Sequence, residues 1–556
     1  MRKKILQDHH VNAFVWFECA KGKLYEKLAS PHGISSINSR SFIIIYQVVY
    51  FVWFLIGIMA LITTLFVIST KTINVPILVL TSLLTFAFFM AVYFRFRQLR
   101  KYKHIPGPAY NFALGNLKQI LLNGHTSRDK AIAAMHEKFG PVIRLHLAWG
   151  SPTIVSMNQV FHKIHDNKLD AIRSADKSVL GENLMGISLN ETHREHRRVL
   201  TPFLGGTAIE RGIPLLRPVL SKLIDKWQMG TTEHGSLQRD VLSWSIHSLG
   251  TFLCGTVWNQ AMNFDRYHDA IEGIEEAISF RAFHPKFVRW IFPRFTVRAK
   301  VDHQYLVQFS KDLIQERINN GLSEGKPSNV LDALAMLASG KYIDEKGKSL
   351  SWSIHTCANE LVSLLLGGTD AMSFVVTQAL LNLAKYPDVQ NDAYSMIISP
   401  NKNKLHGCSV EEAIVRETLR FTPPLPYSSK FSRHQSYDCL GYTIPKKTIL
   451  MPLRPAISRN EKLYSRPDDF ILERLASKSG GSCPFSKESL RSLLPFGIGP
   501  RGCVGSALAT AMCSDFIKQV LGTFQIVLND NVEVQYTSTI AVSVSVLPIK
   551  LEPRIK

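Results

Sequence analysis

A cysteine near the C-terminus lies in a glycine-rich loop before a predicted helix. The loop from Pro495 to Gly505 reads PFGIGPRGCVG, and its N–H groups and the helix N-terminus could stabilise a thiolate at Cys503. Gly505 lets a flat group approach the helix closely, and Arg501 could pair with a carboxylate on that group. A planar cofactor that carries carboxylates and a metal ligated by thiolate is haem. The loop therefore predicts a haem-thiolate site.

The same loop also matches a dinucleotide-binding pattern, G-x-G-x-x-G, from Gly497 to Gly502. That interpretation requires a strand before the loop, a βαβ unit around it and an acidic residue about 20 residues later. Asp515 and Asp530 are poorly placed for this role, and Pro500 would sit inside the turn. A free buried cysteine is the remaining alternative, but it explains neither the glycines nor the arginine. The haem interpretation uses every residue of the loop.

The composition of the whole chain indicates which class of protein contains this loop. The 556-residue chain has a formal charge of +21 and is 46% hydrophobic and 20% charged, which excludes disordered and collagen-like proteins. Eight cysteines without a C-x-x-C pair indicate a reduced, intracellular protein. Two uncharged stretches, 28 residues from Phe42 to Ser69 and 23 residues from Thr72 to Phe94, exceed the roughly 20 residues that span a bilayer. We therefore expect a membrane anchor of one or two transmembrane helices.

Basic residues flank the anchor on both sides. Residues 1–103 carry a net charge of +10, and the rest of the chain carries +11. The positive-inside rule places both ends of a two-span hairpin in the cytosol, and one span plus an interfacial helix is the alternative. Because nearly half of the positive excess belongs to the anchor and its flanks, we expect a membrane and no nucleic acid as the partner of these charges.

The remaining elements must position the cysteine loop. We divide the chain into a basic segment (1–41), the anchor (42–94), a basic and proline-rich linker (95–108) and one large domain (109–556). The pattern of the large domain is mainly helical, and its longest helix is expected from Ser353 to Lys385, before Pro387. Weaker strand signals occur at Val142–Leu147, Thr153–Val155 and Gly441–Ile444. The expected fold class is mainly α with small β-sheets.

The cysteine loop resembles the haem-binding signature of the cytochromes P-450, F-x-x-G-x-R-x-C-x-G. The five fixed positions of that signature are filled by Phe496, Gly499, Arg501, Cys503 and Gly505. The resemblance covers the chain from about residue 106 to its C-terminus. It implies the cytochrome P-450 fold after the transmembrane segment, haem b as the cofactor, and Cys503 as the axial ligand of the haem iron.

Two further segments resemble motifs of the same family. Glu417 and Arg420 match its E-x-x-R, which implies a buried network on the haem side of the fold, whereas a surface ion pair is the simpler alternative. The stretch Phe470–Arg474 resembles the P-E-R-F segment, with Leu472 in place of the usual proline. This match implies that Arg474 is the second arginine of the network.

The long helix contains a segment, Gly367 to Ser373, that resembles the A-G-x-[DE]-T-T of the family's oxygen-binding helix. A glycine inside a helix costs about 1 kcal/mol relative to alanine, and the resemblance implies a distorted groove over the iron in return. Gly368 and Asp370 match the family positions, but Ala371 replaces the threonine that helps to deliver protons. Ser373 points elsewhere on a regular helix, so water or a substrate hydroxyl would have to substitute for the threonine.

Cationic side chains are expected around the haem propionates. The segment from residue 192 to 198 resembles the family's W-x-x-x-R helix, with His193 at the tryptophan position and Arg197 at the arginine position. Arg433 matches another propionate-binding arginine. His193 and His196 lack a third ligand at a suitable spacing, so we expect a solvated or propionate-facing role for them and no metal site.

The resemblance implies a haem-thiolate monooxygenase that inserts one oxygen atom of O2 into a hydrophobic substrate, such as a lipid, sterol, terpenoid or xenobiotic. It implies electrons from NADPH through NADPH-cytochrome P-450 reductase, with cytochrome b5 as a second candidate donor. It also implies an integral protein of the endoplasmic reticulum with a cytosolic catalytic domain. Ala371 keeps a second hypothesis open, a haem-thiolate isomerase or dehydratase that acts on a lipid peroxide without external electrons. A non-catalytic haem-binding protein is the third hypothesis.

Overall fold

The computed structural model describes residues 75–554, apart from a few gaps of one or two residues and the longer gaps 123–127, 148–152, 158–168, 172–179, 231–235, 259–261, 284–291, 400–404, 427–429, 433–435, 476–494, 530–533 and 539–541. Its α-helices are α3 (Val75–Lys101), α4 (Leu117–Leu122), α5 (Arg128–Phe139), α7 (Glu191–Leu200), α8 (Thr207–Gln228), α9 (Ser236–Cys254), α11 (Phe264–Phe283), α13 (Pro293–Asn319), α14 (Val330–Ala338), α15 (Ile354–Lys385), α16 (Pro387–Ile398), α17 (Val410–Phe421), α18 (Arg454–Ser458) and α20 (Ser506–Thr523). Short 3-10 helices are η2 (Thr201–Leu204), η3 (Leu472–Leu475) and η4 (Gly499–Arg501).

The strands form one larger sheet and four small ones. They are β1 (Val142–His146), β2 (Thr153–Met157), β3 (Leu169–Ala171), β4 (Tyr342–Ile343), β5 (Ser349–Leu350), β6 (Lys430–Ser432), β7 (Tyr437–Cys439), β8 (Tyr442–Ile444), β9 (Ile449–Pro452), β10 (Phe524–Leu528), β11 (Gln535–Ser538), β12 (Val542–Val546) and β13 (Ile549–Pro553). The larger sheet has the order β1-β2-β9-β6-β3, in which β2 and β9 are parallel and the other pairs antiparallel. All three strand signals of the sequence are confirmed, as β1, β2 and β8. After β9 the chain continues into α18, which contacts α5 and α17.

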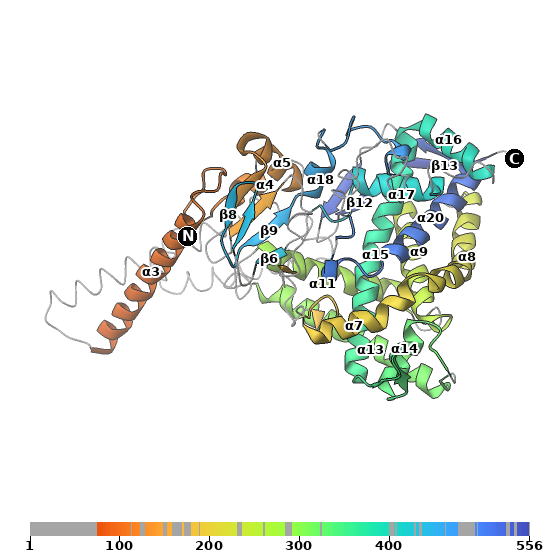
Figure 1. Cartoon of the computed structure of the whole chain (residues 1–556), viewed down its shortest axis with the longest axis horizontal. Coiled ribbons are helices and arrows are strands. Elements are labelled where there is room, and N and C mark those ends of the chain that lie inside the picture. Colours follow the sequence, from red (N-terminus) through yellow and green to blue (C-terminus); the bar gives the residue numbers. More distant parts are fainter. Residues whose placement is uncertain are drawn as a thin grey trace, which may run out of the picture.

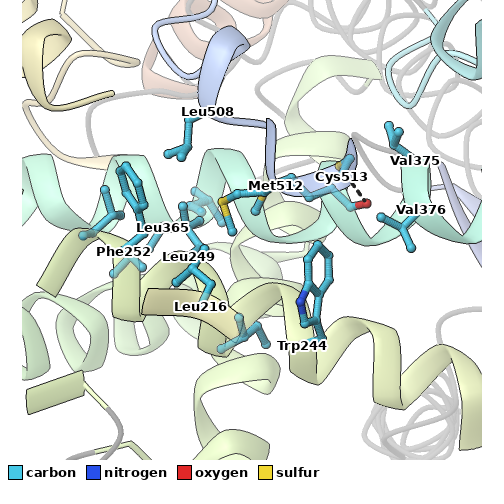
Figure 2. Packing of buried hydrophobic residues seen from close by; sticks show 14 of the residues in the cluster. Leu216, Trp244, Leu249, Phe252, Leu365, Val375, Val376, Leu508, Met512 and Cys513 are labelled. Carbon is cyan, nitrogen blue, oxygen red and sulfur yellow. Dashed lines mark hydrogen bonds between the residues drawn. The ribbon is translucent and has the colours of Figure 1, made fainter. Parts of the chain in front are cut away.

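The longest helix, α15, lies at the centre of the described body (Figure 1). Ser353 caps it by accepting a hydrogen bond from the Thr356 N–H at 3.0 Å, and the helix ends before Pro387. These bounds confirm the sequence prediction. Helices α9, α13, α14, α17 and α20 pack against α15. Figure 2 shows the apolar contacts that α9 and α20 make with it, which include Trp244, Leu249, Phe252, Leu508 and Met512. Most side chains of α15 are therefore buried by these neighbours.

Two described helices are long and apolar enough to cross a membrane, Val79–Lys101 and α15. Their surroundings separate them, because the apolar window of α15 is 67% buried inside the protein and that of the N-terminal helix is 6% buried. We therefore regard α15 as a core helix and α3 as a candidate membrane span, which projects from the body in Figure 1. The first predicted span, Phe42–Ser69, lies outside the described residues.

The C-terminal end of α3 is packed against the body. Arg95 is buried and donates to the carbonyl oxygens of Phe112 and Leu147, both at 3.0 Å. The Tyr102 hydroxyl, just after the helix, lies 2.9 Å from Thr448 Oγ1. The first part of the segment that we expected to be a linker is therefore helical, because its residues find hydrogen-bond partners on the sheet region.

Candidate functional site

A cavity of about 500 Å³ is bounded by α15, α7, the start of α20 and the loop that precedes α20. Six of the residues that the motifs single out in this loop and in α15 line it, namely Gly368, Ala371, Phe496, Arg501, Cys503 and Gly505. The described lining residues are mostly apolar and include no aspartate or glutamate. The cavity therefore suits a molecule that is largely apolar. Because the lining includes arginines, part of the edge of that molecule should carry negative charge.

The loop before α20 turns tightly and brings Cys503 to the cavity wall. Gly497 and Gly499 have φ angles of +67° and +73°, a region that glycine adopts without steric cost. Gly499 begins η4 and is not among the lining residues, so its contribution is the turn itself. The Cys503 N–H donates to the Phe496 carbonyl oxygen at 2.8 Å and closes the loop. A Cβ added at Gly505 would lie 4.0 Å from the Cys503 Sγ, so the glycine keeps the space beside the sulfur open.

The surroundings of the thiol act on its ionisation in both directions. Burial raises the pKa of Cys503, whereas the Gly505 N–H and the Arg197 guanidinium lower it. A metal ion that binds the sulfur stabilises the thiolate far more strongly than these groups. The cysteine thus fits a metal ligand better than a nucleophile that must ionise unaided.

Arginine side chains from distant segments meet at the cavity. Arg197 of α7 donates from Nη1 to the Gly502 carbonyl at 2.7 Å, which ties α7 to the cysteine loop. Arg501 donates from Nη1 to the Leu184 carbonyl at 3.1 Å and also bonds the Ile187 carbonyl. His193 is buried and lines the cavity beside them, whereas Arg433 lies outside the described residues. The pairing predicted for Arg197 and Arg501 with cofactor carboxylates stays a prediction.

Arg454 is a further cavity arginine that the motifs did not indicate. It begins α18, donates from Nη1 to the Leu425 carbonyl at 2.9 Å, and burial lowers its pKa to about 10. Arg454 is only partly exposed, and a guanidinium held largely away from water is costly unless an anion compensates its charge. Because no acidic side chain is among the described lining residues, the cavity arginines fit a cofactor that brings its own carboxylates, as haem does with its propionates. No local sequence signal marks Arg454, since its position depends on β9 and its pairing with β2.

The two glycines of α15 have different surroundings. A Cβ added at Gly368 would lie 2.7 Å from Leu249 Cδ2, so this glycine permits close packing of α9. A Cβ at Gly367 would meet only Met185 Sδ, at 3.7 Å, so this position leaves room in the cavity. Ala371 lines the cavity one turn further on. The helix is continuous through this segment, and the small side chains of Gly367 and Ala371 leave space in the cavity. The distorted groove that the resemblance implies stays a prediction.

Asp370 points away from the cavity that its neighbours line. It is not among the lining residues, and its carboxyl group is hydrogen-bonded to Glu275 of α11. Burial raises the pKa of Asp370, and the charge of Glu272 acts in the same direction, whereas His268 and Glu275 lower it. Its Oδ1 atom has no hydrogen-bond partner among the described residues. Asp370 is therefore a carboxyl group that holds a proton more readily than usual, one residue before Ala371.

Glu417, Arg420 and Arg474 meet in the interior with no exposed side-chain surface. Glu417 accepts from Arg420 Nη2 at 2.7 Å and from Arg420 Nε at 2.9 Å, and Arg474 Nε lies 3.2 Å from the same carboxylate. Both arginines also donate to backbone carbonyls of the segment between β9 and η3, which include those of Ser458, Ser465 and Pro467. Leu472, which replaces the usual proline, is buried in η3 and does not prevent the contact. The network ties α17 to the segment that follows β9.

A match to a family model identifies the family of this chain. The model described as Cytochrome P450 (here cytochrome P-450) matches residues 105–552. The chain belongs to the cytochrome P-450 family. Its relatives include cytochrome P-450 71B3 of Arabidopsis thaliana, which is 24% identical over 77% of this chain and 90% of the relative. A bifunctional cytochrome P-450/NADPH–P-450 reductase of Aspergillus oryzae is 24% identical over 78% of this chain and 40% of its own length. The crystal structure of the cytochrome P-450DA heme domain has a TM-score of 0.67 and 16% identity, covering 81% of this chain and 98% of that one, which shows the same fold.

Membership establishes the general activity of this cytochrome P-450, which is that of a haem-thiolate monooxygenase. The family binds haem, and the cavity of this chain offers a suitable donor set: a thiol on one wall, arginines without acidic neighbours in the described lining, and glycines that keep the space free. The mainly α fold with small β-sheets that the sequence predicts is confirmed.

One buried pair in this cytochrome P-450 was missed by the sequence interpretation. His196 of α7 is buried, and its Nδ1 lies 2.6 Å from Oε1 of Glu360 in α15. The His196 ring also packs against the Trp352 indole, with centroids 4.2 Å apart. The expectation that His196 is solvated is therefore wrong, whereas a role facing a propionate stays a prediction. An acidic residue within the apolar run of α15 was the available signal, because a buried carboxylate requires a partner.

Proposed function

We propose that this cytochrome P-450 is a membrane-bound monooxygenase that inserts one oxygen atom of O2 into a hydrophobic small molecule, using electrons that a reductase takes from NADPH. The cavity carries this proposal, because it combines the Cys503 thiol, arginines and an otherwise mostly apolar lining in one pocket. An apolar cavity excludes water from the reacting atoms and favours an apolar substrate. The substrate class, the reductase and the membrane are parts of the proposal.

In this proposal Cys503 ligates the haem iron, and Arg197, Arg501, Arg454 and His193 surround the propionates. When bound, haem with a thiolate ligand supplies the chemistry that activates dioxygen. The protein's own contribution is to fix the ligand and to neutralise the negative charges of the cofactor. The tie between Arg197 and the Gly502 carbonyl supports this assignment, because it joins a cation to the ligand loop itself.

Asp370 is the proposed proton holder of the site. Its raised pKa and its Oδ1 without a partner among the described residues favour a carboxyl group that can take up and release a proton. The hydroxyl group of Thr369, which precedes it, donates to the Leu365 carbonyl at 2.8 Å and is not available to the cavity. Water or a hydroxyl group of the substrate must therefore carry the proton past Ala371.

The proposal for the electron source rests on a relative and on charge. The Aspergillus oryzae relative is a fusion of a cytochrome P-450 with a reductase, which supports a reductase as the partner of this chain. NADPH-cytochrome P-450 reductase is the proposed partner, and cytochrome b5 is a second donor. The candidate span α3 and the basic residues Arg97, Arg100 and Lys101 at its end support a membrane location, which we propose is the endoplasmic reticulum with the catalytic body in the cytosol.

A second candidate function is favoured by Ala371, which lines the cavity where the family threonine would lie. An isomerase or dehydratase that starts from a lipid peroxide needs no oxygen activation and no proton delivery to dioxygen. Such an enzyme would use the same cysteine and arginines but would be independent of NADPH.

One experiment tests both functions on the full chain in detergent. Reduction under carbon monoxide should give the Soret shift of a thiolate-ligated haem, and Cys503→Ala should abolish that shift while Cys513→Ala, at another cavity cysteine, should retain it. Product that forms only with NADPH and reductase supports the monooxygenase. Product that forms from a lipid hydroperoxide without NADPH supports the alternative. A Soret shift that survives in Cys503→Ala would contradict the ligand assignment.

A further inference from the structure

The α15 wall of the cavity carries a single polar side chain. Seven described residues of α15 line the cavity, Ser363, Leu364, Gly367, Gly368, Ala371, Met372 and Val375, and only the first has a hydrogen-bonding side chain. The neighbouring wall from α9 consists of Leu249 and Leu253, and Leu184 and Met185 complete it from the loop before α7. A hydroxyl group in such surroundings is a point at which a substrate can be oriented.

The proton of the Ser363 hydroxyl has a fixed direction. Its Oγ donates to the Glu360 carbonyl oxygen at 2.9 Å, and Oε2 of the same Glu360 side chain lies 3.4 Å away. A serine hydroxyl has one proton to donate and two lone pairs that accept. Because both acceptors near this proton among the described residues belong to Glu360, the lone pairs of the Ser363 oxygen remain for a hydrogen-bond donor in the cavity.

Glu360 is held in place by groups from outside α15. The carboxylate has no exposed surface, and its Oε1 lies 2.6 Å from Nδ1 of His196. The His196 ring packs on Trp352, whose Nε1 donates to Glu195 at 3.0 Å, so α7 and the residues before α15 both fix the imidazole. Burial, followed by the Glu360 carboxylate, raises the pKa of Cys357 to about 12. Ser363 therefore lies next to an acidic side chain, Glu360, whose position is fixed by its contact with His196.

Taken together, these contacts favour one kind of ligand group at Ser363. We propose that Ser363, oriented by Glu360 and His196, is a specificity-determining residue that accepts a hydrogen bond from the hydroxyl group of an apolar alcohol. A carboxylate at the same place has no proton to donate and is repelled by Glu360. This inference rests on the proposed function, since it assigns a substrate class to the same cavity.

The test uses three ligands that differ only at one end, dodecan-1-ol, its methyl ether and dodecanoic acid, titrated into the full-length holoprotein in detergent. Their binding is read from the change in the haem Soret band. The alcohol should bind about three- to tenfold more tightly than the ether, which is the ratio that one neutral hydrogen bond gives, and the acid should bind more weakly than the alcohol. Equal affinity of the alcohol and the ether, or no binding of the alcohol, would overturn the proposal.

Three variants locate the effect. Ser363→Ala should remove the preference for the alcohol over the ether and leave the affinity for the ether unchanged. Glu360→Gln should improve binding of the acid at least about threefold, because the repulsion is removed. Thr369→Val is the matched control, since its hydroxyl also lies on α15 but is buried against the Leu365 carbonyl and outside the cavity lining. A preference that persists in Ser363→Ala would refute the assignment.

The failure of this inference can be told apart from failure of the proposed function. Each variant is first reduced under carbon monoxide, and the thiolate-type Soret shift shows that haem and Cys503 are in place. With that shift present and NADPH-dependent turnover of any substrate retained, a wild-type protein that shows no alcohol preference, or a Ser363→Ala variant that keeps it, counts against Ser363 alone. Absence of the shift in the wild-type protein counts against the haem-thiolate function itself.

Discussion

Glu191 and Arg194 in α7 have the same spacing as Glu417 and Arg420 in α17, and each pair forms an ion pair, at 3.0 and 2.7 Å. The first pair is solvent-exposed, with 82% and 73% of the side-chain surfaces accessible, and the second has no accessible surface at all. Both read as E-x-x-R in the sequence. The motif alone therefore does not distinguish a structural centre from a surface contact.

The partners around each pair make the difference. In α17 the carboxylate of Glu417 accepts from two arginines and from the Ile471 N–H, and the arginines reach further backbone carbonyls. In α7, Arg194 Nη1 donates to Glu191, and both side chains are otherwise open to solvent. A buried carboxylate with several donors belongs to a network in which each member compensates the desolvation of the others. Single substitutions in the buried network and in the exposed pair measure how much more the buried network contributes to stability.

The largest effect is expected for Glu417→Gln. This change leaves the charges of Arg420 and Arg474 buried without a carboxylate, which should lower the free energy of unfolding by about 3–5 kcal/mol. Thermal unfolding followed by circular dichroism measures it. Glu412→Gln is the control, because Glu412 forms a partly exposed pair with Arg416, at 2.7 Å, on the same helix. Equal melting temperatures for the two variants would contradict a special role of the buried network.

Arg474→Lys should have the next largest effect. Lysine keeps the charge beside Glu417 but cannot reproduce the bonds of the Arg474 guanidinium to the carbonyls of Ser465 and Arg466, at 2.6 and 3.0 Å. The loss of two buried hydrogen bonds should cost about 1–3 kcal/mol, measured by the same unfolding experiment. A variant as stable as wild type would show that the second arginine acts only through its charge.

Asp370→Asn tests a buried carboxyl group whose Oδ1, unlike the oxygens of Glu417, has no hydrogen-bond partner among the described residues. Because burial raises the pKa of Asp370, the folded chain loses stability as the pH rises from the pKa of the unfolded chain to that of the folded one. The asparagine variant should thus unfold at a higher temperature than wild type at about pH 8, and the difference should vanish at about pH 4.

Turnover should change in the opposite direction from stability in this variant. If Asp370 moves protons, Asp370→Asn should lower the NADPH-dependent rate at least about tenfold while the reduced carbon monoxide spectrum is retained. Asp515→Asn is a matched control, since burial also raises the pKa of Asp515 but it lies on α20 outside the cavity lining. An unchanged rate in Asp370→Asn would exclude Asp370 as the proton holder.

These contrasts show which parts of the site local sequence can predict. The cysteine loop, the glycines of α15 and the spacing of Glu417 and Arg420 are each contained within about a dozen residues, so one turn or one helix face determines them. The ends of α15 follow from Ser353 and Pro387 for the same reason. Such features were predicted from the sequence with nearly correct bounds.

Contacts between distant segments could not be predicted in this way. His196 and Glu360 are 164 residues apart in sequence, and their pairing depends on how α7 packs beside α15. Arg454 reaches the cavity because β9 pairs with β2 in the sheet, and Asp370 meets Glu275 because α11 packs beside α15. The spacing of residues within one segment does not predict contacts of this kind. The local signal among them was Glu360, an acidic residue in an otherwise apolar stretch of α15.

The smallest effect is expected for Glu191→Gln, which breaks the exposed E-x-x-R pair. Solvent and salt screen this contact, so the free energy of unfolding should change by no more than about 0.5 kcal/mol, and the change should shrink further in high salt. The measurement is again the melting temperature, at low and at high ionic strength. A loss comparable to that of Glu417→Gln would mean that spacing determines the strength of the pair. A negligible loss would mean that burial and the additional donors do so, and that E-x-x-R identifies a structural centre only where the surrounding fold encloses it.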